Sequence, residues 1–255
     1  MELYVQQFIT FLLIFLRVTS LFVTAPMFGD QTIPLPVKVA LGLFLSFVLF
    51  SFNAHTLSVV DQKLIGLVIL GVKEIFAGAS LGFAVGIIFG GVRYAGELIG
   101  FDMGFSMATM FDPETNASFP VISELLYLFL LMMFILMNGP HFILESLHAS
   151  YTTIPLGEWG ISQATIASII AITGQMFVIA VKISAPVLIS MFLANVSLGI
   201  LNKAMPQMNI FGVMFPLKIG IGIIVMAATV PVIAFVFKKL LTAFESSIVE
   251  LLRVM

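Results

Sequence analysis

The chain has 255 residues, of which 60% are hydrophobic and only 9% are charged, and its formal net charge is −2. About 25% of the residues of a soluble domain are charged, so this composition excludes a water-soluble fold and indicates an integral membrane protein. The small net charge gives no sign of a nucleic-acid partner, and without cysteine the chain forms no disulfide and uses no thiol.

About six apolar segments follow one another and predict a single all-α membrane domain over residues 1–255. The first three are expected at about Leu3 to Ala25, Val37 to Phe52 and Leu64 to Gly100. The N-terminus lacks a basic stretch and a small-residue cleavage site, so we expect a retained helix there and not a signal peptide. Pro26, Pro34 and Pro36 predict an extended connection between the first two segments, because proline lacks a backbone N–H and disfavours helix before it.

The other three segments occupy the second half of the chain. They are expected at about Val121 to Leu147, Gln163 to Asn202 and Asn209 to Leu240, and a short amphipathic tail follows the last. Pro155 and Gly157 predict a loop between the fourth segment and the fifth. Pro186 lies inside the fifth segment and is expected to break it.

Two of the predicted helices, residues 64–100 and 163–202, are too long for a bilayer. Each would measure about 55–60 Å at about 1.5 Å per residue, whereas the hydrocarbon core is only about 30 Å thick. Such helices must tilt strongly, break, or leave the bilayer inside a larger assembly. We therefore expect partner subunits, and not lipid alone, to shield part of this chain.

A row of glycines recurs every four residues in the third segment: Gly78, Gly82, Gly86 and Gly90. This spacing places all four on one face of a helix, and membrane helices use such faces to bring backbones close together. The row is either a contact face for a partner subunit or a site of tight packing within the chain.

The charged residues that we expect within the membrane are Arg17, Lys73, Glu74, Arg93, Glu97, Lys182 and Lys218. Such charges usually face a protein interior or water, because hydrocarbon disfavours them. Lys73 has Glu74 as its neighbour, and Arg93 and Glu97 are four residues apart and can pair along one helix. Acids that could pair with the lone bases are Glu97, Asp102 and Glu124. Structural ion pairs are the favoured interpretation; a proton or ion relay and side chains that snorkel to the interface are the alternatives.

No residue pattern indicates catalysis. His141, Glu145 and His148 share a helical face and could hold a metal, but they lack the His-Glu-x-x-His spacing of a zinc protease, and a cluster at the membrane exit is favoured. The chain has no phosphate-binding loop, nucleophile elbow or dinucleotide fingerprint. We predict no enzyme, no catalytic residue, no metal and no cofactor.

Three long strings resemble the FliR family of flagellar biosynthesis proteins. Residues Ala95–Pro113 carry an AGE-x-IG-x-x-MGFS-x-A-x-x-FDP pattern. Residues Ala185–Gly222 carry Pro-Gln-x-Asn-x-Phe at Pro206–Phe211 and Phe-Pro-Leu-Lys at Phe215–Lys218, and Arg17–Pro34 is the third string. They are spread along most of the chain, from Arg17 to Gly222, and their length makes the resemblance specific.

The resemblance implies a core subunit of the type III protein export gate, located in the bacterial inner membrane at the flagellar basal body. Members of the family assemble with FliP and FliQ into a helical, pore-forming complex, with FlhB and FlhA nearby, through which unfolded flagellar proteins pass. An assembly of this kind would account for the overlong segments. An export-gate subunit of a virulence injectisome is the alternative, and a secondary transporter with a midplane site is a less favoured one.

The resemblance also implies that the segment 104–120, GFSMATMFDPETNASFP, projects into the pore as a plug. The predicted plug residues are Phe105, Met107, Met110, Phe111, Asp112 and Pro113, with Met103 at their start. Methionine is flexible and can seal an irregular gap, apolar constrictions exclude water and ions, and an Asp-Pro step turns the chain. Ordinary core packing by the same methionine and phenylalanine side chains is the alternative.

Overall fold

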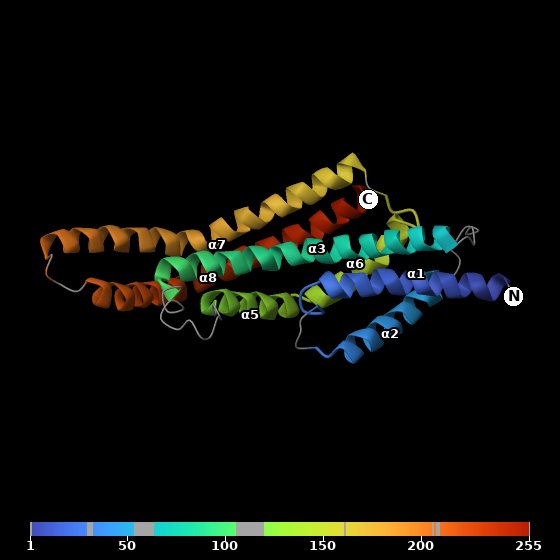
Figure 1. Ribbon diagram of the computed structural model, residues 1–255, viewed down its shortest axis with the longest axis horizontal. Helices are drawn as coiled ribbons and strands as arrows, with labels where there is room; N and C mark the ends of the chain where they lie inside the picture. The colour runs from blue at the N-terminus through green and yellow to red at the C-terminus, as the bar shows by residue number, and fades with distance from the viewer. Residues whose placement is uncertain are drawn as a thin grey trace. The chain divides into compact units, whose positions relative to one another are not determined.

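The computed structural model describes residues 2–29, 33–53, 64–105, 120–160, 162–205, 207 and 210–254. In this part of the chain the secondary structure is helical, with turns and no strand, so the predicted all-α class is confirmed. The helices are α1 (Glu2–Thr24), α2 (Leu35–Asn53), α3 (Leu64–Met103), α5 (Val121–Leu136), α6 (Gly139–Thr153), α7 (Gln163–Ala204) and α8 (Ile210–Val254) (Figure 1).

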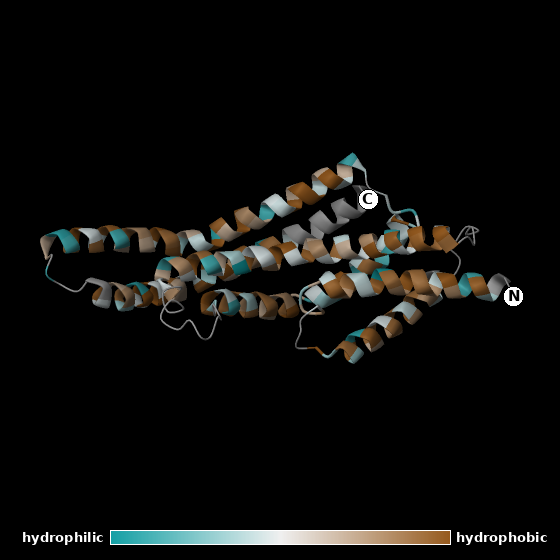
Figure 2. Ribbon diagram, in the orientation of Figure 1, coloured by the Kyte–Doolittle hydropathy of each residue, from teal (hydrophilic) through white to brown (hydrophobic). Residues whose placement is uncertain are grey.

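Membrane-length apolar helices dominate the described chain. Five of them can cross a bilayer by length and composition, and α5 and α6 together could make a sixth span. Figure 2 shows hydrophobic residues along most of α7, with short hydrophilic stretches between them. α3 has 40 residues, α7 has 42 and α8 has 45, which confirms the prediction of overlong helices.

The fourth predicted segment is not one helix: α5 and α6 meet at a bend of 68°. Asn138 adopts a left-handed conformation with φ of 59°, which ends α5, and Pro140 stands in the first turn of α6. A proline fits well in the first turn of a helix, because a backbone N–H there has no helical acceptor. A Cβ at Gly139 would overlap the ring of Phe134, so only glycine fits the inside of this bend.

Proline does not interrupt the helices where we expected it to. α7 continues through Pro186, and α8 contains both Pro216 and Pro231. A proline removes one backbone hydrogen bond, but in apolar surroundings the remaining backbone groups still need partners, so the helix persists. Pro36 likewise lies in the first turn of α2 and not in an extended connection, because an N–H there would have no helical acceptor.

The chain divides into two compact units, and it passes between them within α3, α5, α7 and α8. The first unit comprises residues 1–87, 134–173 and 242–255, and the second comprises residues 88–133 and 174–241. Each unit therefore contains part of α3, and each is described here by itself.

In the first unit, α1 lies between α2 and the first part of α3 (Figure 1). A Cβ at Gly42 of α2 would lie 3.3 Å from Cγ2 of Thr19, and one at Gly78 of α3 would overlap the carbonyl oxygen of Arg17. α6 packs on the same helix, where the Tyr151 hydroxyl donates a hydrogen bond to the carbonyl oxygen of Ile14 over 3.3 Å. α1 thus contacts three other helices.

In the second unit, the second part of α3 contacts α5 and α7. A Cβ at Gly96 would overlap the backbone of Ser123 in α5. Tyr94 lies edge-on to Phe177 of α7, with ring centroids 5.9 Å apart. These contacts fix which faces of α3 and α5 are turned toward each other, and hence where their charged residues lie.

Candidate functional site

A fully buried ion pair joins α1 to α3 in the first unit. Nε of Arg17 donates to Oε2 of Glu74 over 2.6 Å, and Nη2 donates to Oε1 over 3.2 Å. Both side chains have no solvent-exposed surface. Two parallel, charge-assisted hydrogen bonds of this kind are strong and directional, so the pair fixes the two helices against each other.

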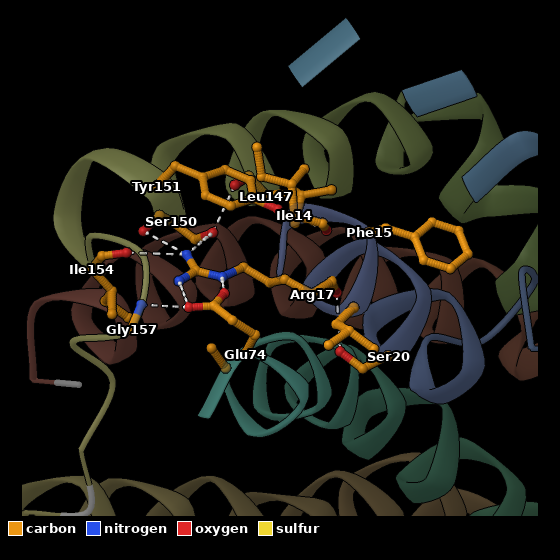
Figure 3. A network of polar contacts seen from close by, with 12 residues as sticks. Ile14, Phe15, Arg17, Ser20, Glu74, Leu147, Ser150, Tyr151, Ile154 and Gly157 are labelled. Atoms are coloured by element: carbon orange, nitrogen blue, oxygen red, sulfur yellow. Dashed lines mark hydrogen bonds and ion pairs between the residues drawn. The ribbon is translucent and has the colours of Figure 1, made fainter. Parts of the chain in front are cut away.

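The remaining donors of Arg17 are satisfied by α6 and the residue after it (Figure 3). Its Nη1 donates to the carbonyl and hydroxyl oxygens of Ser150 over 3.1 and 3.2 Å, and to the carbonyl oxygen of Ile154 over 3.1 Å. The guanidinium carbon lies 4.4 Å from the centre of the Tyr151 ring, a cation–π contact. A buried charge needs this degree of compensation, because leaving water is costly for it.

The same network holds the turn that follows α6. The backbone N–H of Gly157 donates to Oε1 of Glu74 over 2.7 Å, and Nζ of Lys73 donates to the Gly157 carbonyl over 3.1 Å. Beyond it, the Trp159 ring stacks on Phe76 with centroids 5.4 Å apart. Two charged residues of α3 thus bind the backbone of a turn more than eighty positions along the chain.

The sequence did not reveal this pairing. We expected the partner of Arg17 among the later acids, Glu97, Asp102 and Glu124, and we read Glu74 as the neighbour of Lys73. Successive residues on a helix do not face each other. This rule alone could have indicated that Glu74 pairs with a residue other than Lys73.

A second ion pair, half-exposed, joins α3 to α5 in the second unit. Nη2 of Arg93 lies 3.5 Å from Oε2 of Glu124, and the side chains are 48% and 53% exposed. The guanidinium carbon is 4.0 Å from the centre of the Tyr127 ring, and the Ser123 hydroxyl donates to the Arg93 carbonyl over 2.9 Å. The expected pairing with Glu97 is not the one formed, because Tyr127 and Glu124 draw the guanidinium toward α5.

The other predicted intramembrane charges are not gathered into one site. Glu97 is exposed and Asp102 is half-buried on α3, while Lys182 is exposed on α7 and Lys218 is half-buried on α8. Among the described residues, none of these four forms an ion pair.

The first two glycines of the predicted row face α1. A Cβ at Gly78 would overlap the Arg17 carbonyl oxygen, and one at Gly82 would lie 2.8 Å from the carbonyl oxygen of Leu21. Helix α1 therefore approaches α3 closely at these two positions, and this contact places Arg17 beside Glu74.

The last two glycines of the row have looser surroundings. A Cβ at Gly86 would lie 3.6 Å from the Thr24 carbonyl oxygen, and one at Gly90 would lie 3.5 Å from Cε of Met176 in α7. Both are ordinary van der Waals distances, so the need for glycine is concentrated at the start of the row.

Most of the predicted plug lies outside the described residues: Met107, Met110, Phe111, Asp112 and Pro113. Phe105 is described and half-buried. Met103 is fully buried, and a Cβ at Gly222 of α8 would lie 2.7 Å from its Sδ, so this methionine packs inside the chain. Gly104, with φ of 88°, ends α3 in a left-handed turn.

The face with His141, Glu145 and His148 does not gather metal ligands. All three side chains are exposed, and His148 lies edge-on to Phe52 at 6.3 Å. Within the described ranges, no group of three histidine, cysteine, aspartate or glutamate residues could hold a metal ion.

An open apolar groove of about 450 Å³ lies between α7 and α8 in the second unit. Its lining residues are small or aliphatic: Ser190, Leu193, Ala194, Ser197, Leu198, Leu201, Val213, Leu217 and Ile221. The two serine hydroxyls donate to backbone carbonyls of their own helix, so the groove presents an apolar surface.

Comparison with known proteins identifies relatives over nearly the full length. Residues 8–244 match the family described as bacterial export proteins, family 1. The flagellar biosynthetic protein FliR of Bacillus subtilis is 33% identical over 239 residues, which is 92% of this chain and 91% of the relative. The protein of the same name in Escherichia coli is 31% identical over 220 residues, 86% and 83% of the two chains. That of Aquifex aeolicus is 29% identical over 225 residues, 88% and 86%.

The family match covers the residues of both ion pairs, the first membrane-length helix from residue 8 onward, and the other described membrane-length helices. Several apolar helices of membrane length and a family of flagellar export proteins identify a multi-pass protein of the inner membrane at the flagellum, with a role in export. The chain belongs to the FliR family of bacterial export proteins.

Proposed function

We propose that this chain is a core, non-enzymatic subunit of the flagellar type III export gate. In this proposal it forms, with FliP and FliQ, the channel through which unfolded flagellar proteins leave the cytoplasm, with FlhB and FlhA nearby. Family membership supports a role in export; the partners and the channel are the proposal.

The proposal rests on one observation: the apolar surface of the longest helices extends beyond the thickness of a bilayer. Helix α7 has 42 residues and is about 63 Å long at about 1.5 Å per residue, about twice the thickness of the hydrocarbon core. Large apolar side chains are exposed along its whole length, among them Ile166, Ile170, Phe177, Val181, Ile189, Phe192, Leu193 and Ile200. Lipid covers only part of this surface, so other proteins must cover the rest.

The groove between α7 and α8 supports the same conclusion. The groove is lined by exposed leucines, among them Leu193, Leu201 and Leu217, and by small residues such as Ala194. Small residues let another helix approach closely in a membrane protein. A groove of this composition is suited to an apolar partner helix.

We further propose that residues 106–119 plug the channel at rest. The supporting features are the left-handed turn at Gly104, where α3 ends, and the methionine and phenylalanine content of the segment that follows. Apolar side chains that meet on an axis exclude water and so block ions, and flexible methionines can rearrange around varied cargo.

Co-purification tests the subunit assignment. A tagged chain produced together with FliP and FliQ should purify in a fixed ratio with both, whereas produced alone it should be poorly soluble in mild detergent. If the chain forms a stable homo-oligomer and binds neither FliP nor FliQ when they are produced with it, the proposal is contradicted and a transporter is favoured.

Deletion of residues 106–119 tests the plug. Cells that carry the shortened chain should leak small ions, measured as loss of membrane potential, while the complex still forms. A second deletion, of residues 243–255, is the control for shortening the chain. An assembled complex that lacks the segment and remains ion-tight would contradict the plug.

A further inference from the structure

The second unit carries a charged face in a chain that is otherwise apolar. We define the charged face as Arg93 and Glu97 of α3 with Glu124 of α5. Arg93 and Glu124 are about half-exposed, and Glu97 is exposed as well. The contact between Gly96 and Ser123, the residues that precede the two glutamates, makes the face continuous across both helices.

Lipid does not cover the charged face. Hydrocarbon strongly disfavours ionised side chains, and those within membrane segments face protein or water and pair with one another. α3 and α5 are both part of the membrane-length helices. Arg93 and Glu97 lie inside α3, and Glu124 lies in the first turn of α5. Something polar must therefore lie against this face in the working protein.

The charges of the face do not balance. Arg93 is already engaged by Glu124 and by the ring of Tyr127, 4.0 Å from its guanidinium carbon. Glu97 lies one helical turn from Arg93 and forms no ion pair with any residue that the structure describes. The face thus has one positive and two negative groups, and it lacks one cation.

Apolar side chains surround these charges. Phe101, one turn beyond Glu97, is 72% exposed, and Val121 and Leu128, one turn to either side of Glu124, are 52% and 54% exposed. Water alone would leave these large apolar groups uncovered. A protein helix satisfies both requirements, since it covers apolar side chains and can present a charged one.

We propose that the charged face is the binding surface for a helix of a neighbouring subunit, which places a lysine or arginine against Glu97. This inference rests on the proposed function, in which the chain is one subunit of a heteromeric gate. It adds the chemistry of one contact: an acid of this chain, surrounded by apolar side chains, selects a partner that carries a base at the matching position.

Charge reversal tests the contact. In cells that produce the full set of gate proteins, Glu97→Lys should lower the amount of partner that co-purifies with the chain by about tenfold or more, because like charges would meet in a buried contact. Glu97→Asp should retain most of it, and Glu97→Gln should fall between the two. Glu145→Lys makes the same charge change at an exposed carboxylate of α6 and should leave co-purification unchanged.

Suppression and labelling complete the test. Replacement of the partner's basic residue by glutamate, selected as a suppressor, should restore binding to Glu97→Lys. Because the chain has no cysteine, Glu97→Cys offers a single thiol. In the assembled complex it should react with a water-soluble maleimide far less than after denaturation in SDS.

Each contrary result has a distinct meaning. Normal co-purification of Glu97→Lys, or full labelling of Glu97→Cys in the complex, would overturn this inference and would leave the subunit assignment standing. Full labelling would indicate a water-lined face. Failure of the unaltered chain to co-purify with any gate protein would refute the proposed function, and this inference with it.

Discussion

The chain contains two arginine–glutamate pairs that are built alike and placed differently. Arg17 and Glu74 are fully buried and joined by two hydrogen bonds, the shorter of 2.6 Å. Arg93 and Glu124 are about half-exposed and 3.5 Å apart. In each pair a tyrosine ring lies near the guanidinium, at 4.4 Å in the first and 4.0 Å in the second.

The difference shows how one kind of ion pair can have two uses. The first pair finds all its partners within the chain: a helix on each side, a turn and an aromatic ring. Its buried charged groups are not available to bind another molecule. The second pair is open on one side and has an unpaired acid, Glu97, beside it. Five substitutions, together with their controls, can break or sharpen this contrast.

The largest effect is expected from Arg17→Met. It leaves the carboxylate of Glu74 buried without its cation, and breaking a buried pair in this way costs about 3–5 kcal/mol. Thermal unfolding of the detergent-purified chain measures the loss, and the amount of chain in the membrane should fall with it. Because Arg17 also binds Ser150 and Ile154, the turn after α6 should become accessible to protease.

The control for that variant removes both charges. Arg17→Met combined with Glu74→Gln leaves no buried ion, so part of the lost stability should return. A double variant that is much less stable than Arg17→Met would show that Glu74 supports the fold chiefly through Gly157 and not through the ion pair.

A smaller effect, about 1–3 kcal/mol, is expected from a methyl group at the helix contact beside each pair. Gly78→Ala would push α1 away from α3 at Arg17, and Gly96→Ala would push α5 away from α3 at Ser123. Gly199→Ala is the matched control, since no atom lies within 4 Å of its Cβ position. Unfolding of the three purified variants measures the differences; equal stability of all three would contradict the close packing.

The helices were largely predictable because their signal is local. Long apolar runs set the bounds of α1, α3 and α7 to within a few residues. The bend at Asn138 and the continuity through Pro186 were not predicted. Both depend on surroundings: the close contact of Gly139 with the Phe134 ring, and an apolar environment that keeps a helix intact past a proline.

The charged clusters were predictable only in part. The sequence identified Arg17, Glu74, Arg93 and Glu97 as unusual, but not which would meet. Arg17 and Glu74 are 57 positions apart, and their meeting depends on the register between α1 and α3. Arg93 contacts Glu124 and the Tyr127 ring of α5 and not Glu97, four residues along its own helix. Spacing along one helix cannot reveal such a contact between helices.

A loss of about 1 kcal/mol is expected from Ser150→Ala, which removes one hydroxyl acceptor of Arg17 and leaves the carbonyl acceptors of Ser150 and Ile154 in place. Unfolding of the purified chain again measures it. Ser190→Ala is the matched control, because that hydroxyl bonds only the carbonyl of Pro186 in its own helix. A loss as large as that of Arg17→Met would mean that the network acts as one cooperative unit.

An effect on stability far below that of Arg17→Met is expected from its counterpart, Arg93→Met. A half-exposed pair contributes about 0–1 kcal/mol, and the contact with Tyr127 adds about 0.5–1 kcal/mol. The purified chain should therefore unfold close to the unaltered one. Its Glu124 can still reach water or detergent head groups, which buried Glu74 cannot. If both arginine variants lost stability equally, burial would not be what separates the two pairs, and the charged face would belong to the core of its own chain and not to a partner.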